Sequence, residues 1–164
     1  MIWVVFCGRA GWSQPAAAGA VWTYHYDNSR TGQNINETVL TPANVNTNAF
    51  GKLFTYPVDG QIYAEPLFVP GVIILGQGTR NVVFVATQHD SVYAFDADNN
   101  GGPTGGLLWH VSLGTSAATP NNDFGNRYGP YHDIDPEVGI TSTPVIDLTS
   151  GTMYTARQSR NRVC

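Results

Sequence analysis

Charged side chains and cysteines are both scarce in this chain of 164 residues. Only 12% of the residues are charged, and eight Lys and Arg against twelve Asp and Glu leave a formal net charge of −4. This acidic balance lacks the basic patch that binding to nucleic acid or to an anionic membrane surface requires. The two cysteines, Cys7 and Cys164, lie outside the strand pattern, so neither a disulfide framework nor a cysteine metal site is predicted.

Long apolar runs are also missing. No stretch approaches the roughly 20 apolar residues of a membrane-spanning helix, so no integral membrane segment is predicted. The sequence is instead rich in turn formers, with 18 Gly and 10 Pro, while 42% of its residues are hydrophobic and 12% are aromatic. Many short strands joined by turns have this composition, whereas long amphipathic helices do not. We therefore predict an all-β fold.

One stretch of the sequence predicts a complete four-stranded sheet unit, because apolar runs rich in Val and aromatic residues alternate with turn formers. The second run has no polar alternation, which is typical of an interior strand buried on both faces. In the fourth run every second residue from Leu107 to Leu113 shares one face, and we expect Trp109 on that face to pack against a neighbouring sheet. The four strands are predicted at residues 61–69, 82–86, 92–95 and 107–113.

A second, incomplete copy of this unit is predicted from residue 142 to residue 156. Pro66 of the first copy corresponds to Pro144 at a spacing of 78, and Phe84 corresponds to Tyr154 at a spacing of 70. Because proline lacks the N–H that a paired strand donates, the first strand of each copy is predicted at a sheet edge. The chain is therefore predicted to be a β-propeller fragment of about one and a half four-stranded antiparallel blades.

A long polar loop, residues 114–139, joins the two copies, and such loops in compact domains are often functional. In blade topology this loop leaves the sheet at the same end of the strands, and so on the same face of the propeller, as the turn at residues 88–90. The two should therefore be neighbours. Asp133, Asp135 and Glu137 lie at alternate positions, and in an extended segment they would converge on one side and could bind a hard cation. Solvated loop charge is the alternative. The other candidate site residues on this face are His89, Asp90 and His132, with a plain polar turn as the alternative for the first two.

The glycine-rich turn of the first unit carries half of a calcium-binding loop. Asp96, Asp98 and the Asn100-Gly101 pair match the first half of an EF-hand loop. The twelfth position, however, is Leu107 rather than a bidentate Glu, and strands flank the loop where helices are required. A plain turn is therefore predicted.

Six segments describe the organisation of the chain. Residues 1–20 are predicted as the remnant of a secretory signal, because an apolar start precedes alanine-rich cleavage sites, and a ragged or misassigned start is the alternative. A secretory signal favours a periplasmic or secreted protein. Residues 157–164 break the strand pattern and are predicted as an atypical, truncated or frame-shifted tail. The other segments are 21–59 for an N-terminal segment with a strand, 60–113 for the first complete blade, 114–139 for the inter-blade loop and 140–156 for the start of the second blade.

The repeat resembles that of the pyrroloquinoline-quinone (PQQ)-type, quinoprotein alcohol dehydrogenase-like β-propellers. Residues 93–97 (YAFDA), with Gly105 four residues before Trp109, look like the Ala-x-Asp turn and the Gly-x-x-x-Trp outer strand of that family. Residues 40–45 (LTPANV) and 52–56 (KLFTY) are similar to its N-terminal segment. The motifs occur in the order that the family has them, so the resemblance implies a PQQ-like repeat β-propeller.

The resemblance implies two functional classes. Quinoprotein dehydrogenases of this family hold PQQ and Ca²⁺ in the central channel, but their catalytic and cofactor-binding positions are not assignable in this chain, and their adjacent cysteine pair is missing. Many relatives are propellers without the cofactor that act as scaffolds. We therefore expect a non-catalytic binding or assembly scaffold for a protein or small-molecule ligand, which needs further blades of its own chain. The N-terminal part of a PQQ- and calcium-dependent dehydrogenase is the alternative.

Overall fold

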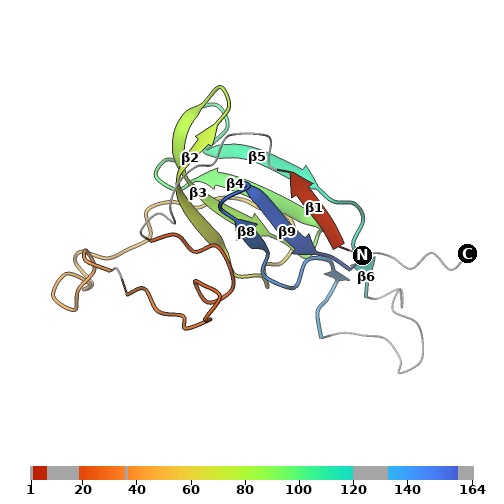
Figure 1. The fold of residues 1–164 in the computed structure, drawn as a ribbon, viewed down its shortest axis with the longest axis horizontal. Helices are drawn as coiled ribbons and strands as arrows, with labels where there is room; N and C mark the ends of the chain where they lie inside the picture. Colours follow the sequence, from red (N-terminus) through yellow and green to blue (C-terminus); the bar gives the residue numbers. More distant parts are fainter. Residues whose placement is uncertain (1, 7–18, 36, 120–132, 159–164) are drawn as a thin grey trace, which may run out of the picture.

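The structure is a computed structural model, and it describes residues 2–6, 19–35, 37–119 and 133–158. The described part contains strands and turns but no helix, as the composition predicts. It therefore holds no helix long and apolar enough to cross a membrane. Its strands form a four-stranded, a three-stranded and a two-stranded sheet (Figure 1).

The four-stranded sheet is the predicted first unit. Its antiparallel strands follow one another in space as they do in the sequence, and all the residues of the third strand are buried. The first strand starts later than predicted, because residues 61–66 form no strand, and the strand expected in the N-terminal segment is also not among the described strands. The four strands are β2 (Leu67–Ile74), β3 (Gly78–Ala86), β4 (Ser91–Asp96) and β5 (Leu107–Ser112).

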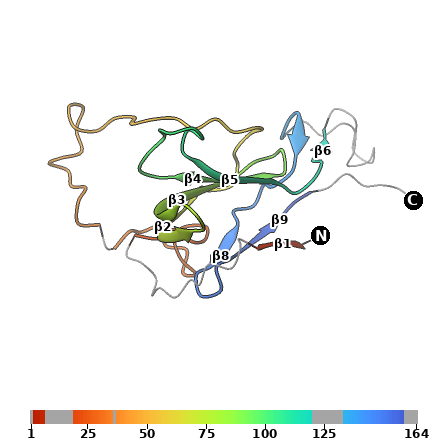
Figure 2. The same cartoon turned by 90° about the horizontal axis from the view of Figure 1, so that it is seen from above.

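Both faces of this sheet are covered. On one face, Phe84 and Trp109 pack with Ile146 and Met153 of the three-stranded sheet in the main hydrophobic cluster. On the other face, residues 54–58 of the N-terminal segment cross the sheet and place Tyr56 and Val58 on a second cluster. Figure 2 shows the four-stranded sheet between the extended segment and the three-stranded sheet. Trp109 is partly buried on the main cluster, to which both sheets contribute residues.

The predicted faces of β5 are wrong at two residues, Leu107 and Leu108. The pairing of β4 with β5 shifts between Ala94, which faces Trp109, and Phe95, which faces Leu107. This bulge reverses the alternation of side chains along β5. Leu107 therefore packs on the second cluster, while Leu108 packs with Trp109 on the main cluster.

The three-stranded sheet contains the second copy of the unit. Leu67 of β2 faces Phe84 of β3, and Val145 faces Tyr154 in the same antiparallel way. The two following pairs along each ladder also correspond, so both predicted spacings, 78 and 70, lead to one register. The predicted internal repeat is thus confirmed for its first two strands. The strands of this sheet are β1 (Ile2–Phe6), β8 (Val145–Asp147) and β9 (Thr152–Ala156), in the order β1-β9-β8.

Strands β2 and β8 each lie at the edge of their sheet, as the two prolines predict. Between these edges runs the N-terminal segment, where Val21 forms a two-way bridge with Phe68 and the carbonyl of Trp22 accepts a hydrogen bond from Ile146 N at 2.8 Å. The starts of the two copies also touch directly, because Glu65 N donates to Thr143 Oγ1 at 2.9 Å. Equivalent positions of the two copies therefore lie side by side.

Equivalent residues of the two copies differ in burial. Leu67 and Phe84 are 1% and 4% exposed, because they face the three-stranded sheet. Their counterparts Val145 and Tyr154 are 38% and 43% exposed. Among the described residues, the second sheet thus leaves exposed the face that is equivalent to the covered face of the first sheet.

The loop between the two copies is closed by a small sheet at its described ends. Strands β6 (Ala117–Ala118) and β7 (Glu137–Val138) pair antiparallel, and Thr119 N donates to Pro136 O at 3.0 Å just beyond them. This pairing brings the end of the loop back to the sheet. It also fixes Glu137 beside the turn between β3 and β4.

Candidate functional site

The turn between β3 and β4 and the end of the long loop form one polar cluster, as predicted from blade topology. Gln88 in this turn is fully buried, and its Oε1 accepts a hydrogen bond from Gly139 N at 2.8 Å. Its Nε2 donates to Ile140 O at 3.3 Å and to Thr141 Oγ1 at 3.2 Å. A buried amide must have its hydrogen-bonding groups satisfied. Gln88 therefore ties the first copy to the segment that starts the second.

Gly139 is required at this junction by lack of space. A Cβ atom on it would lie 2.3 Å from Gln88 O, 2.5 Å from Asp90 Oδ1 and 2.9 Å from Asp90 N. Real Cβ atoms essentially never make contacts this short, so any other residue would push the two segments apart. Glycine at this position lets the two segments of the chain approach closely.

His89 and Glu137 are the two predicted site residues that meet. The Nδ1 atom of His89 lies 2.9 and 3.0 Å from the carboxylate oxygens of Glu137, with side chains 55% and 19% exposed. The hydrogen bond to Glu137 raises the pKa of His89 above its ordinary value, against a smaller opposing effect of burial. Ser116 Oγ donates to the same carboxylate. Glu137, and not His89, is therefore the group that accepts the hydrogen bond of the Ser116 hydroxyl, which differs from the Ser–His pairing of many nucleophilic sites.

Asp90 is buried and paired with a residue from the predicted atypical tail. Arg157 NH1 donates to Asp90 Oδ2 at 2.6 Å, and the two side chains are 10% and 0% exposed. Asp90 Oδ1, which faces Gly139, has no hydrogen-bond partner among the described residues. Burial raises the pKa of Asp90, although the hydrogen bond and charge of Arg157 act in the opposite direction. The pair joins the β3–β4 turn to the chain that follows β9.

Asp59 was not predicted as a site residue, because the sequence shows it only as part of an Asp-Gly turn. Its carboxylate accepts hydrogen bonds from Thr87 Oγ1 at 2.9 Å and from Ser91 Oγ at 2.6 Å. Burial favours a higher pKa for Asp59, but the hydrogen bonds from Ser91, Thr87 and Tyr93 outweigh it and lower the pKa. Asp59 therefore holds the N-terminal segment against both ends of the β3–β4 turn as an anion.

The side chains of the three predicted metal ligands have different surroundings and partners. Asp133 is exposed, and Asp135, also exposed, accepts a hydrogen bond from Thr119 Oγ1, while Glu137 faces His89. Residues 133, 134 and 136 are bends, so the alternation expected for an extended segment is interrupted. Within the described ranges no three His, Cys, Asp or Glu side chains are grouped so that they could hold a metal ion. The metal site stays a prediction, and His132 lies outside the described residues.

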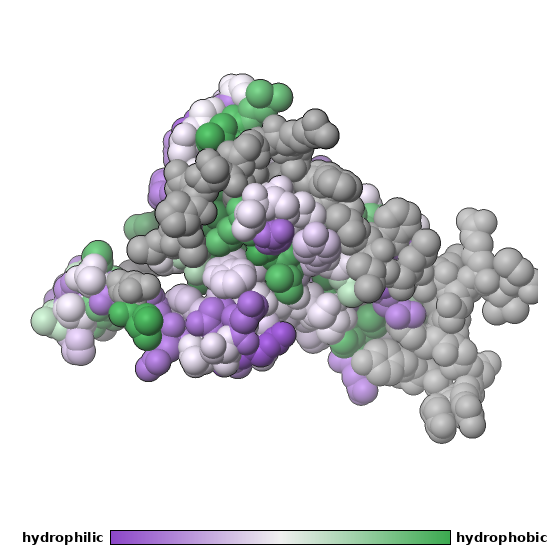
Figure 3. Space-filling model, viewed as in Figure 1, coloured by the Kyte–Doolittle hydropathy of each residue, from purple (hydrophilic) through white to green (hydrophobic). Residues whose placement is uncertain are grey.

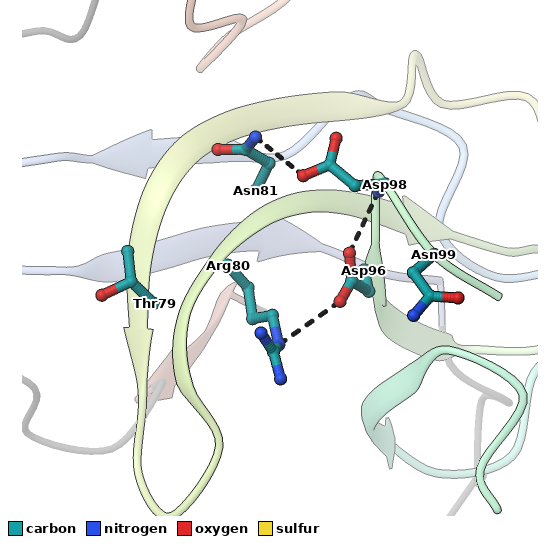
Figure 4. Close-up of a pocket in the computed structure, with 6 residues that line it drawn as sticks. All are labelled: Thr79, Arg80, Asn81, Asp96, Asp98 and Asn99. Carbon is teal, nitrogen blue, oxygen red and sulfur yellow. Dashed lines mark hydrogen bonds and ion pairs between the residues drawn. The ribbon is translucent and has the colours of Figure 1, made fainter. Parts of the chain in front are cut away.

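A separate hollow of about 260 Å³ lies beside the turn after β4. Figure 4 shows Arg80 and Asn81 of β3 reaching toward Asp96 and Asp98. Arg80 Nε lies 3.3 Å from Asp96 Oδ2, Asn81 Nδ2 donates to Asp98 Oδ2 at 2.9 Å, and Asp98 N donates to Asp96 Oδ1 at 3.0 Å. These bonds tie Asp96 and Asp98 to neighbouring groups, and the plain turn stays a prediction. The lining residues are Thr79, Arg80, Asn81, Asp96, Asp98 and Asn99.

Comparisons of the chain with family models, with curated proteins and with solved structures gave no match.

Proposed function

We propose that this chain belongs to a PQQ-like repeat β-propeller of a periplasmic or secreted protein, in which it acts as a non-catalytic binding or assembly scaffold. The repeat supports the propeller part of the proposal. Two hairpins share one register at the spacings that the sequence predicts, and their edge strands start side by side. Sheets related in this way are the building blocks of radial architectures.

The proposed scaffold role rests on one observation: the side chains of the polar cluster are hydrogen-bonded within the chain. The described polar side chains at the β3–β4 turn bind backbone groups or one another, and Gln88, Asp59 and Asp90 each join two segments of the chain. Catalytic sites instead present a nucleophile or base toward a substrate position. Polar groups that join segments of the chain to one another support a structural role, as in a scaffold.

The open face of the second sheet supports a need for further sheets of the same polypeptide. Val145 and Tyr154 form a cross-strand pair that is partly exposed, whereas the equivalent pair in the first sheet is buried. Repeat units generally bury their faces only against neighbours, and three or more are needed for stability. Another sheet packed on Tyr154 would bury this pair.

Reconstitution with PQQ and Ca²⁺ tests the proposal. The complete polypeptide that contains this chain is purified without cofactor, loaded with PQQ and Ca²⁺, and assayed for dye reduction with alcohols and sugars. A scaffold gives no turnover and no PQQ-dependent quenching of tryptophan fluorescence. Cofactor-dependent turnover would refute the scaffold role and establish the quinoprotein dehydrogenase alternative. A parallel titration with Ca²⁺ alone, on the native protein and on Asp133→Asn/Asp135→Asn, tests the predicted metal ligands.

A further inference from the structure

Strand β9 has a neighbour on its second edge that is remote in the sequence. One edge of β9 pairs with β8, to which a short turn connects it, and the other edge pairs antiparallel with β1 from Ile2↔Ala156 to Phe6↔Thr152. Every other ladder in the described sheets joins strands that follow one another in the sequence. Figure 1 shows β1 and β9 lying side by side, with β8 on the far side of β9. The β1–β9 ladder therefore does not arise from a local hairpin.

The register of β1 reproduces that of the third strand in the first sheet. Phe84 of β3 faces Ala94 of β4, and its counterpart Tyr154 of β9 faces Val4 of β1. The neighbouring pairs correspond in the same direction along both ladders. Strand β1 thus takes on β9 the place that β4 takes on β3.

The residue types at these equivalent positions also agree. In β4 the four residues from Val92 to Phe95 are uncharged, buried and either aliphatic or aromatic. The residues of β1 in the matching register, from Ile2 to Val5, are likewise aliphatic or aromatic, with Trp3 at the position of Tyr93. The third-strand place therefore accepts one kind of strand in both sheets.

We propose that the edge of β9 opposite β8 is an acceptor site for an extended, uncharged strand of the Val92–Phe95 kind, and that Ile2–Phe6 occupies this site in cis. The main-chain N–H and C=O groups of an open strand edge pair readily with another extended segment, and alternate side chains then set the specificity. The predicted secretory segment, residues 1–20, contains β1. Its removal would leave the edge of β9 open to a strand of this kind. The inference does not depend on the proposed scaffold role.

Two proline variants test whether β1 occupies the edge. Successive residues of a strand direct their N–H groups to opposite sides, so only one of Val4→Pro and Val5→Pro removes a group that faces β9. We expect that variant to lose hydrogen-exchange protection at alternate amides of β9, from Thr152 to Ala156, while the amides of β3 and β4 keep theirs. The other variant serves as the matched control. Equal protection of β9 in both variants would overturn the proposal.

A peptide with the sequence of residues 91–96 (SVYAFD) tests what the site accepts. Added to the variant with the open edge, it is expected to restore protection at the same alternate amides of β9, with binding followed by fluorescence anisotropy of the labelled peptide. The native chain, whose edge is filled, should bind it more weakly. The control peptide carries Ala94→Pro and Phe95→Pro and should not bind. Equal binding of both peptides, or no protection by the native sequence while a peptide of residues 2–6 protects, would refute the proposed strand type.

Discussion

Replacing Gly139 by alanine tests the contact between the two sheet copies at its tightest point. The added methyl would lie 2.3 Å from Gln88 O and 2.5 Å from Asp90 Oδ1. Neither atom can move freely, because Gln88 N donates to Gln61 O at 2.8 Å and the Asp90 carboxylate is held by Arg157 at 2.6 Å. Overpacking of this kind costs about 1–3 kcal/mol. Loss of the 2.8 Å hydrogen bond from Gly139 N to Gln88 adds about 1 kcal/mol, so we expect a loss of about 2–4 kcal/mol.

Pulse proteolysis across a urea gradient measures this loss at low protein concentration, where association is suppressed. The matched control is Gly51→Ala, because a Cβ at Gly51 meets no atom within 4 Å. That variant should differ from the native chain by less than about 1 kcal/mol. If Gly139→Ala lowers the free energy of unfolding by less than about 0.5 kcal/mol, or by no more than the control, the contact between the copies does not contribute as argued.

Three further predictions concern charge and exposure. Arg157→Met should lower the free energy of unfolding by about 3–5 kcal/mol, because it leaves the carboxylate of Asp90 buried without a cation; the loss should shrink in acid as that carboxyl protonates, and an Asp90→Asn background should abolish most of it. Because the pKa of His89 is raised in the folded chain, the contact of His89 with Glu137 should stabilise the fold fully below the ordinary pKa of 6.5 and less as the pH rises through the folded-state pKa. The ring is half-exposed, so this stabilisation should be at most about 1 kcal/mol, and Glu137→Gln should remove the resulting dependence of the urea midpoint on pH. The apolar tip of the β2–β3 hairpin, where Leu75 is 96% exposed, should promote self-association, so Leu75→Lys should lower light scattering, and a monodisperse native monomer with cooperative unfolding would contradict this (Figure 3).

The repeat was predictable because each of its signals has a local physical cause. Pro66 and Pro144 mark edge strands since each lacks an N–H, and the uninterrupted apolar runs mark strands covered on both faces. The neighbourhood of His89 and Glu137 followed from topology alone, because connections that leave one end of a sheet lie together. Local signals of this kind placed the polar cluster correctly without showing which of its groups would pair.

Three features were beyond the sequence for a physical reason. The reversal at Leu107 depends on a bulge, which periodicity does not reveal. The pairing of Arg157 with Asp90 joins residues 67 positions apart, whereas residues 157–164 were predicted as an atypical, truncated or frame-shifted tail. The ladder between β1 and β9 joins the two most distant strands of the described chain, and nothing in an apolar run tells which edge it will find.

Two kinds of contact hold the sheet copies together, and they have different effects. Burial of the main hydrophobic cluster, which includes Phe84 of one sheet and Met153 of the other, supplies a large but non-directional stabilisation that would tolerate sliding of one sheet over the other. The hydrogen bonds of Gln88 to the segment before β8, and of Glu65 to Thr143 at the edge strands, are directional and allow one offset between the copies. Since a repeat array is stabilised by each unit and by its contacts with its neighbours, the polar cluster sets the geometry that apolar packing then stabilises.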